Sequence, residues 1–296
     1  MPQRGTKAPA GGRQGGRVSS RRGDRTVTPG GSIVTVRTQQ DLALEVSGLC
    51  KTFYSRTGGE RAALTDVSFS IPRGSCLAVV GESGSGKTTA ARIVAGLEHA
   101  TAGKVRLTDH PATGRTRRSV QMVFQDPYGS LDPRQAIGAG LHELLRLHGL
   151  RRKSERQGRV AELLEAVGLD ERHARQYPSS LSGGQRQRVA IARALALDPS
   201  LLILDEAVSA LDVSVQAQVL NLLADIRAMT HISYMFVSHD LGVVRQVSDT
   251  CVVLEHGRVV ETGRTADVLD SPQKTYTQAL VEAVPRPGWQ PKRRTA

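Results

Sequence analysis

Residues 76–97 read CLAVVGESGSGKTTAARIVAGL, and three patterns meet in this stretch. The first five residues are an unbroken apolar run, which predicts a strand buried on both faces of a parallel sheet. The next eight match G-x-x-x-x-G-K-[ST], and a helix pattern follows them. Glycines in such a loop let successive backbone N–H groups point at one anion, so we expect phosphate to bind here. A chance Gly/Ser loop is disfavoured, because the motif lies between the strand and the helix that it requires.

Two side chains of this loop have direct chemical uses. Lys87 is placed to reach the outer phosphates of a nucleotide, and the Thr88 hydroxyl is placed to bind Mg²⁺. The loop therefore predicts a site for a nucleotide and a magnesium ion.

The composition is that of a soluble protein with a hydrophobic core. The chain has 296 residues, of which 39% are hydrophobic and 23% charged, enough for one large domain or two modest ones. No apolar run approaches the ~20 residues of a membrane span, and no hydrophobic segment follows the basic N-terminus as in a signal peptide. Three cysteines without paired or metal-binding spacing, Cys50, Cys76 and Cys251, indicate a reducing compartment.

The formal net charge of +12 is concentrated at the two ends of the chain. Residues 1–40 hold eight Lys or Arg side chains against one acid, and residues 285–296 hold four more basic side chains. Basic ends bind nucleic acid or anionic headgroups in some proteins. We favour the simpler interpretation that they are solvated, with residues 1–40 a disordered tail.

Two strands are expected before the phosphate loop, at 42–46 and 65–71, because their apolar residues alternate. They favour an antiparallel layer beside the nucleotide-binding core. Phe53 and Tyr54 lie between these strands. An aromatic side chain there either stacks on adenine or packs in the protein, and spacing alone does not separate the two.

The middle of the chain predicts a helical insertion. Strand patterns at 103–107 and 120–124 are followed by helix patterns at 135–147 and 154–167. No strand pattern occurs from 128 to 180, so this block is expected to be an all-helical insertion in an α/β protein.

A second anion-binding element follows, at 181–185, which reads LSGGQ. Ser182 can cap a helix over 186–197, and the paired glycines permit close approach of the backbone. A serine hydroxyl and free N–H groups at a helix start predict a second phosphate contact.

Two later strands end in polar residues. The apolar run 201–204 leads into Asp205 and Glu206, where P-loop enzymes hold Mg²⁺ and where a second carboxylate can orient water. The strand at 232–237 is followed by His239. Ligands bind at this edge of such sheets, so a functional role is expected for the histidine.

Together and in this order, the motifs resemble the ATP-binding subunit of an ABC transporter over roughly residues 42–284. The matching motifs are the Walker A loop at 81–88, Gln125 of the Q-loop, the signature at 181–185, Walker B at 201–205, the catalytic Glu206, the D-loop at 209–212 and the switch histidine His239. The resemblance implies an α/β fold with a P-loop NTPase core of the ABC ATPase type, an antiparallel β layer and an all-helical subdomain.

The resemblance also implies a division of the chain. The ABC ATP-binding domain would cover 41–270, with the helical subdomain inserted at about 128–185, and residues 271–296 would form a C-terminal extension of the oligopeptide-transporter type with a basic end.

Site residues follow from the same motifs, with ATP and Mg²⁺ as the bound groups. Catalytic roles are implied for Glu206, His239, Lys87 and Gln125. Nucleotide contacts are implied for Phe53 (Tyr54 being the near alternative), Gly81, Glu82, Ser83, Gly84, Ser85, Gly86, Lys87, Thr88, Thr89, Ser182, Gly184 and Asp212. The implied Mg²⁺ ligands are Thr88, Gln125 and Asp205.

The segments at 212–219 and 271–277 are similar to those of the oligopeptide, dipeptide and nickel importer subgroup. Lys274 and Thr275 stand where that subgroup commonly has His-Pro, and Ala207 and Val208 stand where the wider family often has Pro-Thr. These departures leave the cargo open. Peptides are favoured, and nickel or another small solute is the alternative.

Family members work as head-to-tail dimers, so Ser182 and Gly184 are implied to act on ATP held by a partner subunit. Implied partners are two multi-span permease subunits, a sister ATPase (a heterodimer rather than a homodimer) and an extracytoplasmic solute-binding protein, with no direct nucleic acid. The expected location is peripheral, at the cytoplasmic face of the inner membrane. A soluble ABC-type ATPase acting on nucleic acid is disfavoured, because the sequence has no long coiled-coil insertion, zinc-finger cysteine set or second ATPase copy.

Overall fold

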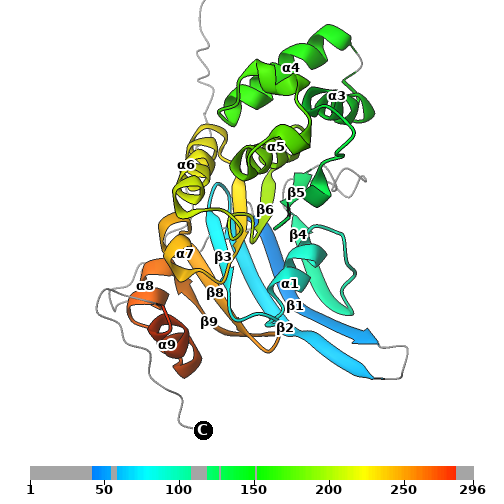
Figure 1. Cartoon of the computed structure of the whole chain (residues 1–296). Helices are drawn as coiled ribbons and strands as arrows, with labels where there is room; N and C mark the ends of the chain where they lie inside the picture. The colour runs from blue at the N-terminus through cyan, green and yellow to red at the C-terminus, as the bar shows by residue number, and fades with distance from the viewer. Residues whose placement is uncertain (1–41, 55–58, 108–118, 127, 151, 285–296) are drawn as a thin grey trace, which may run out of the picture. The chain divides into compact units, whose positions relative to one another are not determined.

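The computed structural model describes residues 42–54, 59–107, 119–126, 128–150 and 152–284. The tail predicted at 1–40 and the basic end at 285–296 lie outside these residues. Within them, the elements form two sheets and a set of covering helices (Figure 1).

The central sheet has six strands in the order β5-β6-β7-β3-β8-β9. Each neighbouring pair in this order from β5 through β3 to β8 is parallel, and β9 is antiparallel to β8. Every residue of β3, β6 and β7 is buried, as expected for strands covered on both faces. The bounds are β3 (Cys76–Val80), β5 (Val120–Val123), β6 (Leu201–Asp205), β7 (Ser233–Val237), β8 (Thr250–Glu255) and β9 (Arg258–Arg264).

A second, three-stranded antiparallel sheet has the order β2-β1-β4, which confirms the predicted antiparallel layer. Its strands are β1 (Leu42–Tyr54), β2 (Glu60–Pro72) and β4 (Ala102–Leu107). The strand expected at 65–71 is therefore too short, because the pairing of β1 with β2 continues out to Tyr54 and Glu60. The first helix, α1 (Lys87–Val94), shares one hydrophobic core with strands of both sheets.

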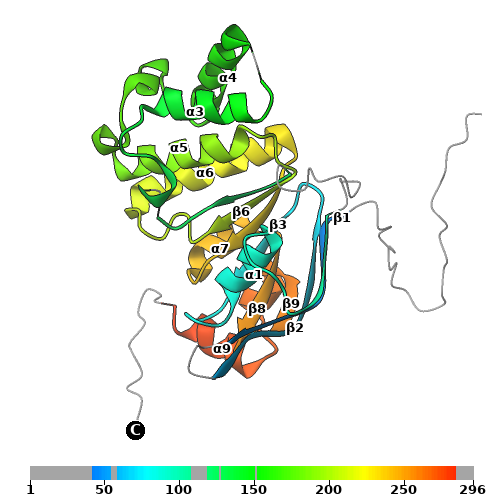
Figure 2. The ribbon, with the colours of Figure 1, turned by 90° about the vertical axis from the view of Figure 1, so that its right-hand side faces the viewer.

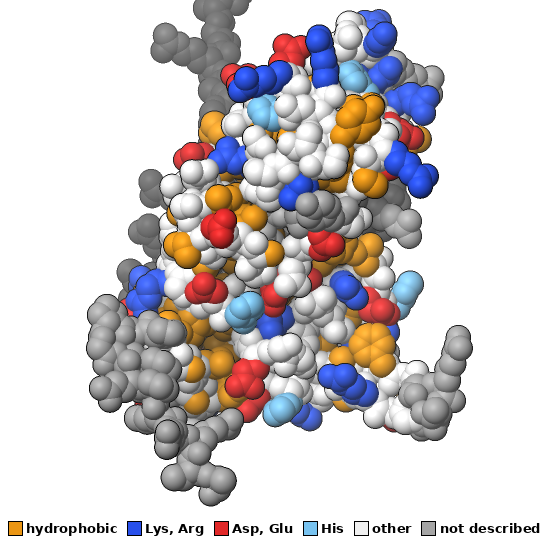
Figure 3. Space-filling model, viewed as in Figure 1, with side chains coloured by type: hydrophobic (Ala, Val, Ile, Leu, Met, Phe, Trp, Pro, Cys, Tyr) orange, Lys and Arg blue, Asp and Glu red, His pale blue; other side chains and the backbone are white. Residues whose placement is uncertain are grey.

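Helices cover the other side of the central sheet. Figure 2 shows α5 and α6 lying between this sheet and the pair α3 and α4. The bounds are α3 (Ile137–Leu147), α4 (Lys153–Ala166), α5 (Gly183–Leu195) and α6 (Val213–Thr230), with short 3-10 turns η2 (Tyr128–Ser130), η3 (Glu171–Arg175) and η4 (Pro178–Ser180). Among the described residues from 128 to 182 there is no strand. On the face drawn in Figure 3, Lys and Arg side chains gather over the α3 and α4 end.

The helix expected at 186–197 begins three residues earlier, at Gly183. The Ser182 hydroxyl accepts a hydrogen bond from the Gln185 N–H, and the Gln185 side chain accepts one from the Ser182 N–H. This reciprocal capping box satisfies N–H groups at the helix start, so it stabilises the two glycines in helical conformation.

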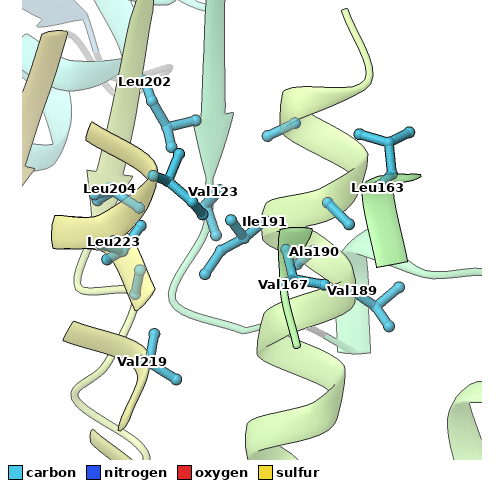
Figure 4. Close-up of a cluster of buried hydrophobic side chains, with 14 of the residues drawn as sticks. Val123, Leu163, Val167, Val189, Ala190, Ile191, Leu202, Leu204, Val219 and Leu223 are labelled. Atoms are coloured by element: carbon cyan, nitrogen blue, oxygen red, sulfur yellow. The ribbon is translucent and has the colours of Figure 1, made fainter. Parts of the chain in front are cut away.

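The helical layer is joined to the sheet by an apolar core. In Figure 4, Ile191 of α5 points toward Val123 and Leu202 of the sheet, whereas Val189 points away from them. Side chains of α4 and α6 complete this core. The core therefore fixes α5, and the capped residues at its start, against the central sheet.

Three short helices close the described chain: α7 (Leu241–Val247), α8 (Thr265–Asp270) and α9 (Thr275–Glu282). They pack with β3 and β8 in a third hydrophobic cluster. The β8–β9 hairpin turns at His256 and Gly257, which both have positive φ, as a type I′ turn requires. No helix in the described ranges has the length and apolarity to cross a membrane.

We predict that Ile191→Ala lowers the free energy of unfolding by about 2–5 kcal/mol, because it leaves a cavity between α5 and the sheet. Met229→Ala on the exposed side of α6 is the control and should change it by less than about 0.5 kcal/mol. Urea unfolding of both variants measures the difference. Equal losses would contradict the proposed role of this core.

Candidate active site

The phosphate loop joins the end of β3 to the start of α1, as the sequence predicts. Gly81, Gly84 and Gly86 have φ of 146°, 80° and 104°. A Cβ on Gly86 would lie 2.7 Å from the Ala63 carbonyl oxygen, so glycine is required for both conformation and space. The Ser85 hydroxyl is buried and has no hydrogen-bond partner among the described residues. A glycine cradle with an unpartnered buried hydroxyl fits a phosphate.

Lys87 is enclosed by the loop that precedes it. Its ammonium donates hydrogen bonds to the carbonyl oxygens of Gly81 at 2.9 Å and Glu82 at 2.8 Å. Burial lowers the pKa of Lys87, while the nearby carboxylates of Glu206 and Asp205 oppose that shift. The ammonium group therefore lies inside the loop, bonded to two carbonyl oxygens that phosphate oxygens can replace.

Thr88 and Asp205 form the pair expected to hold Mg²⁺. The Thr88 hydroxyl donates a hydrogen bond to Asp205 Oδ1 at 3.1 Å, although 117 residues separate them. Burial at the end of β6 raises the pKa of Asp205, the Thr88 hydrogen bond opposes this shift, and Glu206 adds to it. A hydroxyl and a carboxylate within contact distance fit Mg²⁺, which takes few protein ligands and completes its shell with water and phosphate oxygens.

Glu206 and His239 meet at the ends of adjacent strands β6 and β7. The Glu206 N–H donates to the carbonyl oxygen of Val237 at 3.0 Å, and Glu206 Oε1 lies 3.3 Å from His239 Nδ1. Glu206 has a φ of 49°, a strained conformation for a residue with a side chain. Such strain is common where a side chain must be aimed at a reacting group.

A cavity of about 310 Å³ lies beside the loop. The sequence-predicted residues that line it are Phe53, Ser83, Gly84, Gly86, Lys87, Thr88, Thr89 and Glu206. Phe53 is 41% exposed, and the Lys51 ammonium lies 4.7 Å from its ring centroid. Tyr54 is 69% exposed and is not a lining residue, so the geometry favours Phe53 as the stacking aromatic.

Arg61 also lines this cavity, and sequence reasoning missed it. It pairs directly with Phe53 across the β1–β2 ladder. Arg61 belongs to no sequence motif, so only the register of β1 against β2 shows that it lies at the site.

The remaining predicted site residues lie outside that cavity. Ser182 and Gly184 are at the start of α5, where a Cβ on Gly184 would lie 2.4 Å from Val215 Cγ1 of α6. Gln125 donates from Nε2 to the Ser209 hydroxyl at 3.4 Å, which links two motif loops. Asp212 is exposed at the start of α6 and makes no side-chain capping bond.

Fold and site together define a P-loop nucleotide-binding protein. A parallel strand leads into the glycine cradle, and the Thr88–Asp205 pair and Glu206 lie at the same sheet edge. This class includes many families, so the comparisons with known proteins decide among them.

The profile of the ABC transporter family matches residues 64–209. The glutathione import ATP-binding protein GsiA of Salmonella paratyphi A is 46% identical over 255 residues, which is 82% of this chain and 41% of the relative. The chain thus spans less than half the length of that relative. It belongs to the ABC transporter family and is an ATP-binding cassette of the ABC ATPase type.

Solved structures agree with this assignment. CbiO1 from Clostridium perfringens, described as part of the ABC transporter complex cbiONQ, has a TM-score of 0.67 and 27% identity, covering 78% of this chain and 92% of its own. The ATP-binding cassette MJ0796, described as a dimer bound to ADP and Pi, has a TM-score of 0.65 and 29% identity, covering 75% and 98%.

We predict that Gly86→Ala weakens MgATP binding more than about tenfold, the equivalent of about 1.4 kcal/mol, because the new Cβ pushes the loop away from the Ala63 carbonyl. Gly96→Ala is the matched control. Gly96 also has positive φ, but nothing lies within 4 Å of the added Cβ. It should lower stability by about 1–2 kcal/mol and leave binding unchanged. Calorimetric titration measures both, and equal affinities would contradict the steric argument.

Proposed function

We propose that this chain is the ATP-hydrolysing subunit of a membrane importer for small peptides. The observation that carries the proposal is that Lys87, Thr88 and Glu206 line one cavity, with Asp205 hydrogen-bonded to Thr88. This arrangement supplies a loop that binds phosphate, two side chains that bind one Mg²⁺ and a carboxylate that orients the attacking water. These are the parts that phosphoryl transfer to water requires.

In the proposed mechanism, the phosphate loop binds the nucleotide phosphates through its N–H groups. Lys87 exchanges its carbonyl partners for phosphate oxygens, and Glu206 orients a water or accepts its proton. His239, in contact with Glu206, fixes that carboxylate and reaches toward the terminal phosphate. Thr88, Asp205 and Gln125 would hold Mg²⁺, which would supply charge neutralisation at the phosphates.

We propose that a second cassette completes the site. Ser182 and Gly184 are absent from the lining of the nucleotide cavity, yet they form a capped helix start suited to phosphate. In a head-to-tail dimer they would cover ATP held by the partner, with Asp212 at the interface. The dimeric form described for MJ0796 supports this arrangement. Closing and reopening of the dimer would then drive the membrane subunits.

A groove next to Gln125 suits a segment of a membrane subunit. A cavity of about 700 Å³ lies between the end of β5 and helices α3 and α5, and an adjoining one shares Leu131, Asp132, Leu144 and Arg193 with it. The lining of the two cavities combines apolar side chains with the acids Asp132 and Glu143 and the basic side chains of Arg193 and His148, a composition that fits a short amphipathic helix. This role would place the chain peripherally, at the cytoplasmic face of the membrane.

Small peptides are the proposed cargo class. The relative named above is a glutathione import ATP-binding protein, and glutathione is a tripeptide. The cassette itself offers no cargo site in this proposal, so a solute-binding protein and two permease subunits would provide selectivity, with a sister ATPase as the other cassette.

Affinity purification of the chain from its native membranes in mild detergent, with mass spectrometry, tests the assembly. Recovery of two multi-span proteins, a sister ATPase and a solute-binding protein is expected. The ligand of that binding protein then decides between peptide, nickel and other small solutes. Recovery of nucleic acid or ribosomes without membrane proteins would overturn the importer proposal.

We predict that Glu206→Gln retains MgATP binding and lowers turnover by about 100-fold or more, because the amide cannot accept the proton of water. Glu162→Gln on the surface of α4 is the control and should hydrolyse ATP normally. Phosphate release from the purified complex measures both. Near-normal hydrolysis by Glu206→Gln would refute the assigned role.

We also predict that Leu144→Glu reduces recovery of the permease subunits at least about tenfold, because it buries an unpaired carboxylate against the docked segment. Its MgATP affinity should be unchanged. Met229→Glu, on an exposed position of α6, should affect neither quantity. Equal permease recovery with both variants would remove this groove as the docking site.

A further inference from the structure

The C-terminal helix α9 contacts the phosphate loop through one hydrogen bond. The Glu82 N–H donates to the hydroxyl oxygen of Tyr276 at 3.1 Å, across 194 residues of sequence. Glu82 is the second residue of the loop motif. Tyr276 lies in the segment 271–277 and has no part in the proposed hydrolysis of ATP.

This bond holds the peptide unit that also holds Lys87. The Glu82 N–H and the Gly81 carbonyl belong to one planar peptide, and they point in opposite directions because the bond is trans. Tyr276 binds the N–H side, and the Lys87 ammonium binds the carbonyl side at 2.9 Å. Until Lys87 exchanges this carbonyl for a phosphate oxygen, the orientation of this one peptide is therefore fixed by the tyrosine and the lysine together, and afterwards the tyrosine bond remains.

The segment that carries Tyr276 is itself anchored. The Glu261 carboxylate of β9 accepts hydrogen bonds from the N–H groups of Gln273 at 2.9 Å and Lys274 at 3.2 Å. Tyr276 and Val281 pack on the cluster that contains Val80, the last residue of β3 before the loop. The helix therefore has a defined position relative to the loop and can support it.

From these contacts we propose that Tyr276 is a positioning residue, through which α9 sets the affinity of the phosphate loop for MgATP. The proposal rests on the proposed binding of ATP at this loop. Because coupling between two parts of a protein is reciprocal, nucleotide binding must in turn stabilise α9. The C-terminal helix thus reports nucleotide occupancy at a surface outside the nucleotide cavity.

Tyr276→Phe tests the proposal, because it keeps the ring packing and removes only the acceptor. We expect the dissociation constant for MgATP to rise about three- to tenfold, the range that one net hydrogen bond supports, with kcat at saturating ATP changed less than about twofold. Tyr234→Phe is the matched control. The Tyr234 hydroxyl donates to the Leu223 carbonyl at 2.9 Å within the core, so its loss should lower stability and leave MgATP affinity unchanged.

Hydrogen exchange of the full wild-type chain provides a second measurement that needs no variant. MgATP should slow amide exchange in 275–284, and Tyr276→Phe should weaken this protection. Wild-type affinity in Tyr276→Phe, or no protection of 275–284 in a wild-type chain that binds MgATP, would overturn the proposal. Failure of the wild-type chain to bind MgATP would instead refute the proposed function.

Discussion

The parallel pairing of β3 with β7 and of β7 with β6 is the constraint on which the site depends. Val79 pairs with Val237, and Asp205 pairs with the same Val237 from the other side. Because the three strands run in one direction with this register, their carboxyl ends reach a common edge. The phosphate loop, the two carboxylates and His239 therefore meet, although more than 150 residues separate the first from the last.

Holding these groups at a buried edge is energetically unfavourable, and the contacts around them compensate. Burial lowers the pKa of Lys87 and raises the pKa of Asp205, so in both cases it favours the neutral form of the side chain. The loop carbonyls stabilise the lysine, and the Thr88 hydroxyl stabilises the aspartate. Glu206 adds backbone strain, which the ladder bond to Val237 maintains. The rigid apolar cores below the edge make this arrangement possible.

Hydrogen bonds link two further parts of the molecule to the sheet edge that carries the phosphate loop and Glu206, and a third part lies apart from it. The hydrogen bond from Gln125 to Ser209 is one of these links, and Gln125 directly follows Phe124, which lines the groove proposed for a membrane subunit. The capped start of α5 presents Ser182 away from the nucleotide cavity, which suits a partner cassette. The Tyr276–Glu82 bond joins the loop to the C-terminal helix. The edge that carries the phosphate loop is thus hydrogen-bonded both to Gln125 beside the helical layer and to the C-terminal helix.

Local patterns were enough to predict the phosphate loop, the acids after β6, the histidine after β7 and the helical layer, and the family resemblance that these motifs carry in their order implied the fold class. In each case the signal lies within a short segment, as apolar periodicity, motif spacing or a capping serine. Arg61 opposite Phe53 and Tyr276 on Glu82 escaped prediction, as did the early start of α5 and the full length of β2. The first two are contacts between distant segments, and the length of β2 follows from its pairing with β1. The early start of α5 is different, because it comes from the local Ser182–Gln185 capping box, whose sequence pattern was not used to place the start of the helix. The two distant contacts and the length of β2 depend on which segments meet in space, and the packing of the completed sheets and helices decides that.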